Sequence, residues 1–278
     1  MKKIALVTTG SGTQGAYVAG VLDALVSKKI DFTDPSIIVA SSGGISLLYY
    51  VARQYPAFKN IWINLLPTKK FISFARFWRI MDIDYMVDSV FKKQDILNVD
   101  EVLRSQTRLF LNVTNCDTGT SEYLSNDGRS DLFEAMRATT AVPLLYNKKV
   151  EINGSYYVDG QISSSLGQNI EKAVAEGAEK VVVIHYDSGS EFSANSKLFW
   201  KTCSLFTSRP VRKTINRYLK GEYEVPFPEN IPIFHITPSR KLPVEPIDNN
   251  RSRLLATFEL GRNDVLVNKE ALLRFLGK

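Results

Sequence analysis

The sequence is poor in the residues that form disulfide frameworks and metal centres. Its 278 residues include two cysteines, Cys116 and Cys203, and two histidines, His185 and His235. The cysteines lie far apart and form no CxxC pair, which argues against a disulfide-stapled fold and favours a reducing, cytoplasmic location. Two lone histidines without an HExxH pattern argue against a zinc hydrolase.

Long apolar runs are missing as well. No stretch of about 18 apolar residues occurs, so no helix is expected to span a bilayer, and any membrane contact would be peripheral. The first apolar run, Ile4–Val7, is too short for the hydrophobic region of a signal peptide. With 44% hydrophobic and 23% charged residues, the composition is that of a globular chain with a substantial core. No linker divides the sequence, and we expect a single domain over residues 1–278.

Strand-like and helix-like segments alternate along the chain. Apolar and β-branched runs predict strands at Ile4–Val7, Ile37–Ala40, Leu109–Thr114, Val181–His185 and Ile233–Ile236. Apolar spacing and composition predict helices at 16–28, 45–52, 131–139, 171–179 and 253–276. This alternation is typical of an α/β fold, and we expect three layers, α/β/α, with a mainly parallel central sheet.

A glycine-rich turn follows the first predicted strand. It reads Gly10-Ser11-Gly12-Thr13-Gln14-Gly15, a GxGxxG pattern. A strand, a glycine turn and a helix N-terminus aim backbone N–H groups at one point, which suits a phosphate or an oxyanion. A dinucleotide site also needs an acidic residue after the second strand, about 20 residues on. That acidic residue is missing, so a nucleotide-binding domain is the weaker interpretation.

The second turn, Ala40-Ser41-Ser42-Gly43-Gly44, joins a β-branched strand to an apolar helix. A nucleophile elbow of the GxSxG type has this context, because it exposes the hydroxyl of its central serine and brings strand and helix close together. Ala40 and Gly44 are small enough for that approach. Ser42 then stands at the nucleophile position. A serine and glycine turn that only caps a buried helix is the alternative interpretation.

A serine nucleophile needs a base. His185 ends a predicted strand and His235 lies inside another, and a structural role explains either of them. An acidic base is the remaining option. Asp159 ends a β-run and precedes Gly160, so its carboxylate could point into the same crevice as Ser42. On its own, an Asp-Gly pair usually marks only a turn.

These elements, in this order, resemble the patatin-like phospholipase family, whose members carry a glycine-rich oxyanion loop, a GxSxG elbow and a later Asp-Gly-Gly or Asp-Gly-Ala motif. The likeness covers most of the chain. It includes the first-helix run 15–22, the strand-to-loop run 112–119, the helix run 135–143 and the closing-helix run 258–264.

The resemblance implies a serine acyl hydrolase with a Ser–Asp dyad, acting on fatty-acyl esters of phospholipids, lysophospholipids or related lipids. Ser42 attacks the ester carbonyl, Asp159 takes its proton, and water then hydrolyses the acyl-serine. Neither a metal nor a cofactor is required. The backbone N–H groups expected to form the oxyanion hole belong to Gly10, Ser11, Gly12 and Gly43.

Four residues depart from the family pattern. They are Ser11 and Gln14 in the glycine loop, Ala40 in the elbow, and Gln161 after Asp159-Gly160. None of them removes the nucleophile or the base. Gln14 replaces the usual basic residue of the loop, which favours a lysophospholipid, neutral lipid or simple ester over an anionic head group held close to the site. A catalytically impaired lipid-binding protein that kept the fold is an alternative.

The positive charge is concentrated in two aromatic-rich segments. The formal net charge is +6, and Lys197–Lys220 holds seven basic side chains, Thr68–Met81 holds four, and neither holds an acidic one. We expect these two segments to form a lid or an interface with an anionic bilayer. Packing on the core as ordinary amphipathic helices is the alternative.

The side chains expected at the membrane are Lys69, Lys70, Arg212, Lys213 and Arg217. No recognised nucleic-acid-binding module accompanies the charge, so nucleic acid is not expected as a partner.

Overall fold

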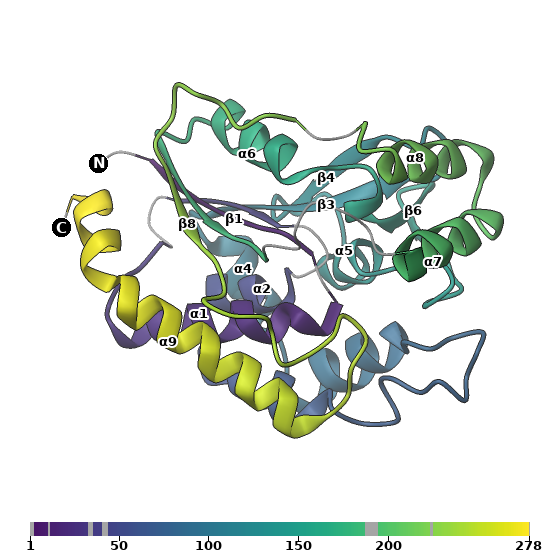
Figure 1. Ribbon diagram of the computed structural model, residues 1–278, viewed down its shortest axis with the longest axis horizontal. Coiled ribbons are helices and arrows are strands. Elements are labelled where there is room, and N and C mark those ends of the chain that lie inside the picture. The colour runs from purple at the N-terminus through teal and green to yellow at the C-terminus, as the bar shows by residue number, and fades with distance from the viewer. Residues whose placement is uncertain are drawn as a thin grey trace.

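The computed structural model describes residues 3–10, 12–32, 36–40, 44–186, 194–222 and 225–277. One mixed sheet runs through this part of the chain, with helices on both faces (Figure 1). Its strands are β1 (Ile4–Thr8), β2 (Ile37–Ala40), β3 (Arg108–Asn115), β4 (Ser121–Ser125), β5 (Val150–Ile152), β6 (Ser155–Asp159), β7 (Lys180–Ile184) and β8 (Ile233–Ile236).

The sheet is mainly parallel, as predicted. Its order is β5-β6-β3-β2-β1-β7-β8, and β4 also pairs with β3. Five neighbouring strands run parallel to one another, namely β3, β2, β1, β7 and β8. β4 and β6 are both antiparallel to β3, and β5 is antiparallel to β6. The carboxyl ends of β1 and β2, where the two glycine turns begin, therefore meet at one edge of the sheet.

Helices cover both faces of this sheet. The α-helices are α1 (Gly15–Ser27), α2 (Ile45–Val51), α3 (Ala57–Lys59), α4 (Val99–Arg104), α5 (Leu132–Thr139), α6 (Leu166–Ala175), α7 (Ala194–Leu205), α8 (Arg209–Leu219) and α9 (Arg251–Leu276). Short 3-10 helices are η1 (Gly12–Gln14) and η4 (Gly160–Ile162), and π-helices are η2 (Asn60–Leu65) and η3 (Tyr85–Gln94). Within the described chain, none of these helices combines the length and apolar character that crossing a membrane requires.

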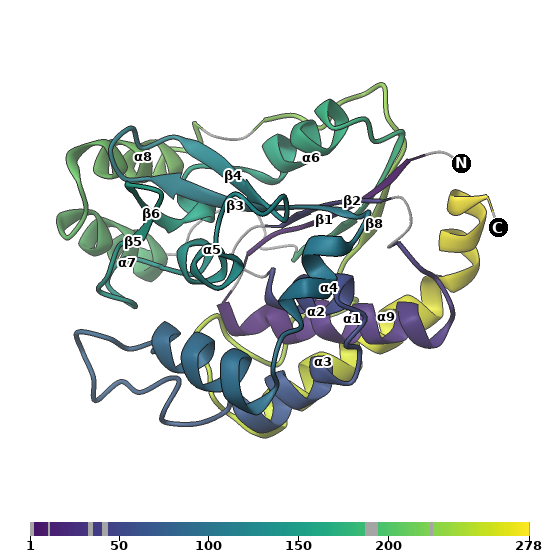
Figure 2. The ribbon, with the colours of Figure 1, turned by 180° about the vertical axis from the view of Figure 1, so that it is seen from behind.

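Alternating side chains of the central strands feed two separate cores. Ala5 and Val7 of β1 pack on the face covered by α6, through Ile170 and Ala173. Leu6 points to the larger core beneath α1, α2 and α9. Figure 2 shows the same three layers from behind, with α6 on one side of the sheet and α1, α2 and α9 on the other.

The contact between α1 and α9 closes the larger core. It depends on two glycines: a Cβ on Gly20 would lie 1.9 Å from the carbonyl oxygen of Phe258, and one on Gly261 would lie 2.3 Å from that of Tyr17. The Tyr17 hydroxyl donates a 2.9 Å hydrogen bond to Asp264 Oδ2 within this contact. The closing helix thus holds the helix that follows the first glycine turn.

β3 extends further along the sheet than its neighbour β2. Ala40, the last residue of β2, pairs with Leu111, and β3 continues for four more residues to Asn115. β6 pairs with β3 only on this overhang, opposite Val113, Thr114 and Asn115. The overhang therefore brings β6 to the carboxyl edge of the sheet from the opposite direction.

Segment 68–81 differs from an amphipathic helix. An antiparallel bridge joins Ile72 to Met81, and the Ser73 N–H donates to the Ile80 carbonyl over 2.9 Å. The segment is a hairpin-like loop, which we call the 73–80 loop. Phe71 and Ile72 are buried, whereas Phe74, Phe77 and Trp78 are exposed. The alternation of basic and aromatic residues reflects this loop geometry rather than a helical face.

Segment 197–220 contains most of α7 and all of α8, and α8 has one apolar and one basic face. Val211 and Ile215 are buried against Cys116, Val158 and Ile162. The basic side chains Arg212, Lys213, Arg217 and Lys220 are exposed. The apolar face of α8 is therefore packed on the protein, and only its basic face is open to a partner.

Candidate functional site

The strand and helix predicted around Ser42 are both present. β2 ends at Ala40, which is fully buried, and α2 begins after Gly44. All seven residues of α2 are buried. Ser42 and Gly43, together with Ser11 of the glycine loop, lie outside the described residues, so their geometry stays a prediction.

Measured along the strand direction, Asp159 lies beyond the level at which β2 ends, with β3 between the two strands. It pairs with Val113, which follows Leu111 by two residues, and Leu111 is the partner of Ala40. Asp159 therefore stands, along the strand direction, two residues past the level of Ala40 and on the far side of β3. In the sequence, Ser42 follows Ala40 by the same two residues.

Asp159 is almost completely buried and its position is fixed by hydrogen bonds. Its backbone N–H donates to the Ala141 carbonyl over 3.1 Å, and its own carbonyl accepts from Thr114 Oγ1 over 2.7 Å. Carboxylate oxygen Oδ1 accepts from the backbone N–H of Gln161 over 2.8 Å. Only the backbone of Gln161 makes this contact, so the side chain that departs from the family pattern leaves the hydrogen bond unchanged.

A polar network lies beneath the turn that follows Asp159. Asn112 accepts a hydrogen bond from Ser164 Oγ at Oδ1, over 2.9 Å, and one from Thr139 Oγ1 at its backbone carbonyl, over 2.7 Å. Thr114 Oγ1 also lies 2.8 Å from Ser163 Oγ. Ser163 and Ser164, which follow the Asp-Gly motif, thus hold η4 against β3.

The glycine loop after β1 is anchored to the segment that precedes α9. The Thr13 N–H donates to the Pro246 carbonyl over 3.0 Å, and Thr13 Oγ1 donates to the Glu245 carbonyl over 2.8 Å. Gly12 has a positive φ of 54°, and a Cβ there would lie 2.3 Å from the Pro246 oxygen. Packing therefore explains this glycine without a bound pyrophosphate, which weakens the dinucleotide interpretation.

Gln14 and Gly15 complete the loop. Gln14 Nε2 donates to the Val244 carbonyl over 3.3 Å, and the Gln14 carbonyl accepts from the Tyr186 hydroxyl over 3.0 Å. A Cβ on Gly15 would lie 2.6 Å from the ring of Trp62. In this chain the residue at position 14 thus ties the loop to its surroundings.

The two histidines contact each other. His185 Nε2 lies 3.1 Å from His235 Nδ1, at the carboxyl ends of β7 and β8. Burial lowers the pKa of His235 below its usual value. Within the described residues, no three histidine, cysteine or acidic side chains are grouped closely enough to hold a metal ion.

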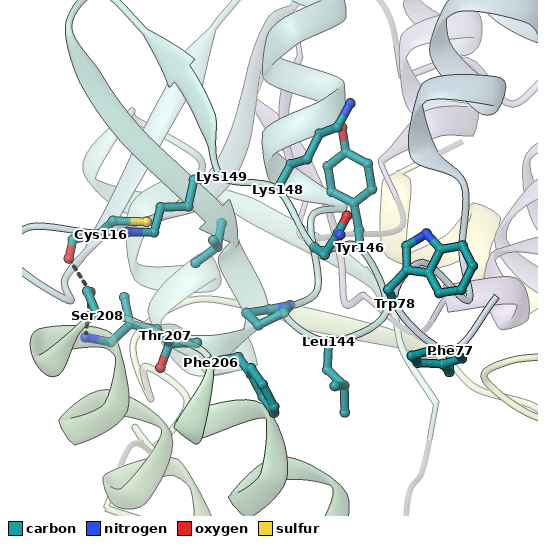
Figure 3. Close-up of a pocket in the computed structure, with 14 residues that line it drawn as sticks. Phe77, Trp78, Cys116, Leu144, Tyr146, Lys148, Lys149, Phe206, Thr207 and Ser208 are labelled. Atoms are coloured by element: carbon teal, nitrogen blue, oxygen red, sulfur yellow. Dashed lines mark hydrogen bonds between the residues drawn. The ribbon is translucent and has the colours of Figure 1, made fainter.

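A pocket of about 510 Å³ lies where β6 packs against α8, and Asp159 is not among the residues that line it. Val158, the preceding residue, lines it, and so does Pro143, two residues after the hydrogen-bond acceptor Ala141. Figure 3 shows Phe77 and Trp78 on one side of the pocket, Phe206 and Ser208 on the other, and Leu144 between them. The full lining is Phe77, Trp78, Cys116, Pro143, Leu144, Tyr146, Asn147, Lys148, Lys149, Val158, Phe206, Thr207, Ser208 and Val211.

Sequence reasoning missed the residues of this pocket that lie outside segments 68–81 and 197–220. Cys116 lies at the end of β3, and burial raises the pKa of its thiol to about 11. Leu144 has a left-handed backbone with φ 73°, which is unusual for a bulky residue. Lys148 and Lys149 stand on an ordinary polar connection before β5. No local pattern marks these residues, because folding alone brings them together.

Residues 6–172 match the family model of the patatin-like phospholipase, which is more than half of the chain. The chain belongs to the patatin-like phospholipase family. The matched range includes the glycine loop, the elbow and Asp159.

A curated relative and a solved structure were also found. The uncharacterized protein YjjU of Escherichia coli K12 is 27% identical over 197 residues, covering 66% of this chain and 51% of the relative. The chain thus spans about half the length of that protein. The crystal structure of VipD from Legionella pneumophila aligns with 96% of this chain and 67% of its own, with 13% identity and a TM-score of 0.49.

Proposed function

We propose that this protein hydrolyses fatty-acyl esters of lipids with a Ser42–Asp159 dyad. Membership in the patatin-like phospholipase family supports lipid hydrolysis in general. The observation that carries the dyad is the register of β2, β3 and β6. It puts the buried Asp159 two residues beyond the level of Ala40, and Ser42 is two residues beyond Ala40 in the chain.

The proposed reaction has two steps. Ser42 Oγ attacks the ester carbonyl carbon while Asp159 accepts the hydroxyl proton, and the proton then passes to the departing alkoxide as the acyl-serine forms. Water attacks the acyl-serine with Asp159 again as base, which releases the fatty acid and restores Ser42. Both steps need a carboxylate with a fixed position, and three hydrogen bonds from neighbouring backbone and side chains hold Asp159.

The oxyanion of the tetrahedral intermediate would be stabilised by backbone N–H groups of the glycine loop and of Gly43. One such donor contributes roughly 3–4 kcal/mol to lowering the barrier. Thr13 is excluded as a donor because its N–H already binds Pro246. The remaining candidates are Gly10, Ser11, Gly12 and Gly43.

We propose that the substrate is a phospholipid, a lysophospholipid or a related lipid ester in or near an anionic membrane. α8 buries Val211 and Ile215, so it would meet lipid head groups with its basic face rather than insert. Lys69 and Lys70 are exposed as well. Two of the predicted contacts are partly engaged within the protein: Arg212 donates to the carbonyls of Ser204 and Leu205, and Arg217 pairs with Glu222.

Hydrolysis of a p-nitrophenyl acyl ester tests the dyad. Ser42→Ala and Asp159→Asn should each lower kcat/KM by about a thousandfold or more, because both residues act in the same chemical step. Asparagine keeps an oxygen acceptor for the Gln161 N–H, so the turn should fold. Matched controls are Ser155→Ala on β6 and the exposed Asp117→Asn, which should hydrolyse the ester like the wild type. Equal activity of wild type and Ser42→Ala would disprove the proposal.

A fluorophosphonate probe separates the enzyme from an impaired lipid-binding relative. Stoichiometric labelling of the wild type, lost in Ser42→Ala and retained in Ser155→Ala, supports a competent elbow. A protein that binds lipid but resists labelling would be the impaired alternative. A rise in melting temperature with NAD or NADP would instead favour the nucleotide-binding alternative.

A further inference from the structure

Exposed aromatic side chains from two distant segments frame the entrance of the pocket that Val158 lines. Phe77 and Trp78 of the 73–80 loop are 74% and 52% exposed, and Phe206 after α7 is 69% exposed. All three line the pocket. Phe74 and Leu205 are exposed beside them in the chain. We call these five residues the aromatic mouth.

The 73–80 loop turns its arginines inward and its aromatic rings outward. Arg76 lies 3.2 Å from Asp82 Oδ2 and also donates to the carbonyls of Lys70 and Phe71. Arg79 lies 3.3 Å from Asp82 Oδ1. A loop adapted only to water would be expected to show the opposite arrangement. Because these bonds already order the loop, it would lose little conformational entropy when its rings become buried.

The other side of the mouth is also fixed to the protein. Ser208 Oγ donates to the Cys116 carbonyl over 2.5 Å, and Thr214 Oγ1 donates to the Gly119 carbonyl over 2.6 Å. Arg212 Nε donates to the Ser204 carbonyl over 3.0 Å, at the end of α7. These hydrogen bonds hold the end of α7 in place, so the exposed side chains of Leu205 and the following Phe206 have a fixed position.

The pocket leads from this exposed mouth to a buried apolar floor. Cys116, Val158 and Val211 line the floor and are nearly inaccessible to solvent. Val158 precedes Asp159 in β6, so the two side chains point to opposite faces of the strand. Both ribbon views show the mouth-forming segments, α7 and the 73–80 loop, at the end of the molecule opposite to the two chain termini (Figures 1 and 2).

The basic side chains around the aromatic mouth favour an anionic partner. The three segments that supply the pocket entrance, 68–81, 143–149 and 197–220, hold four, two and seven basic side chains and no acidic one. Three of these basic side chains, Arg76, Arg79 and Lys148, pair with Asp82 or Asp84 just outside the segments. These thirteen charges exceed the net charge of +6, so the rest of the chain is net negative. A second copy would bring the same positive charge to this face, whereas aromatic rings among basic side chains match the boundary of an anionic bilayer.

We propose that the aromatic mouth is a membrane-docking surface for an anionic phospholipid bilayer. The rings of Phe74, Phe77, Trp78 and Phe206, with the Leu205 side chain, enter the boundary between head groups and acyl chains, and the surrounding basic side chains contact the head groups. The pocket then opens into the apolar layer, and a lipid chain moves into it without crossing water. The fate of that lipid rests on the proposed hydrolase function, but docking itself requires no hydrolysis.

Vesicle sedimentation with the Ser42→Ala protein tests docking apart from catalysis. The vesicles are phosphatidylcholine alone and phosphatidylcholine with phosphatidylglycerol. We expect binding to the anionic vesicles, a marked loss in high salt, and a fall of about tenfold or more in the partition coefficient for Phe74→Ser/Leu205→Ser and for Phe77→Ser/Trp78→Ser. The matched control is Ile96→Ser/Val267→Ser, which removes side chains that are 61% and 83% exposed but do not line the pocket, and should bind like its parent.

Two results would overturn docking at this surface. One is unchanged binding of both mouth variants, with melting temperatures equal to that of the parent. The other is an absence of vesicle binding together with a dimer in light scattering that the mouth substitutions dissociate, which would make the surface an interface between copies. Ester hydrolysis by the wild type is measured separately, so an inactive enzyme that still docks refutes only the proposed function.

Discussion

Gly160 lies so close to Asn112 that a Cβ on it would stand 2.2 Å from both the backbone oxygen and the side-chain Oδ1 of Asn112. Both oxygens of Asn112 are held in place, because Oδ1 accepts a hydrogen bond from Ser164 and the backbone oxygen accepts one from Thr139. The residue after Asp159 must therefore be glycine for the β6 turn to close on β3.

Gly160→Ala should lower the free energy of unfolding by about 1–3 kcal/mol, because the added methyl group can fit only if β6 moves away from β3. It should also reduce ester hydrolysis, since the same movement displaces Asp159. Urea denaturation and the p-nitrophenyl ester assay measure the two effects. Gly154→Ala is the matched control: Gly154 has a φ of 81° but no atom near its Cβ position, so alanine there should cost backbone strain without loss of activity.

The carboxylate of Asp84 pairs with Arg79 of the 73–80 loop over 3.2 Å, and its contribution to stability should depend on pH. It accepts hydrogen bonds from Lys148 and Tyr146, both over 2.6 Å, and pairs with Arg137. Burial alone would raise the pKa of Asp84, but these hydrogen bonds and the Arg137 charge outweigh it and hold the pKa below its usual value. The stabilisation is therefore complete above the pKa of the unfolded chain, near 4, and is lost as the pH falls through the folded-state value.

We expect Asp84→Asn to cost about 1–3 kcal/mol at pH 7, with the difference from the wild type shrinking below about pH 4. Urea denaturation between pH 7 and pH 3 measures this convergence. The control Asp100→Asn removes an exposed carboxylate whose distance from Arg104 is 3.6 Å, and should change little at any pH. A constant difference across the pH range would show that Asp84 acts through packing alone.

Both cysteines should be unreactive in the folded protein, although Cys116 lines the pocket. Burial raises the pKa of Cys116 to about 11 and that of Cys203 to about 12. At pH 8 only about one Cys116 thiol in a thousand is then the reactive thiolate. Titration with a disulfide reagent should find close to zero reactive thiols at first and two after unfolding in urea. Rapid labelling of the native protein, lost in Cys116→Ser, would contradict this description of the pocket floor.

Much of the sheet could be predicted from local sequence. The ranges Ile37–Ala40 and Ile233–Ile236 coincide with β2 and β8, and the all-apolar run at 45–52 predicted the buried α2. Short β-branched runs are clear signals because central parallel strands are buried on both faces. β4, by contrast, was missed: every residue of Ser121–Ser125 is half-exposed and the strand has no β-branched residue, so it carries no such signal.

Ion pairs with residues outside the segment explain why the conformation of segment 68–81 could not be predicted from its own sequence. Its basic and aromatic residues suggested a second amphipathic segment, but Asp82 and Asp84, outside that segment, draw Arg76 and Arg79 inward. The sequence indicated which residues matter at the pocket entrance without indicating their directions. Likewise, the Asp-Gly pair could be found in the sequence, but its approach to the end of β2 depends on the register between β3 and β6.

The four-residue overhang of β3 makes the spacing between the end of β2 and Asp159 a property of the sheet rather than of a loop. Residues advance by about 3.3 Å along a strand, and neighbouring side chains point to opposite faces. A slip of one residue in the pairing of β3 with β6 would therefore displace the carboxylate by that distance and present Val158 or Gly160 in its place. Insertions should thus be tolerated in the connection between β4 and α5 far better than within residues 111–115, where a single added residue would change the alignment of the two halves of the site.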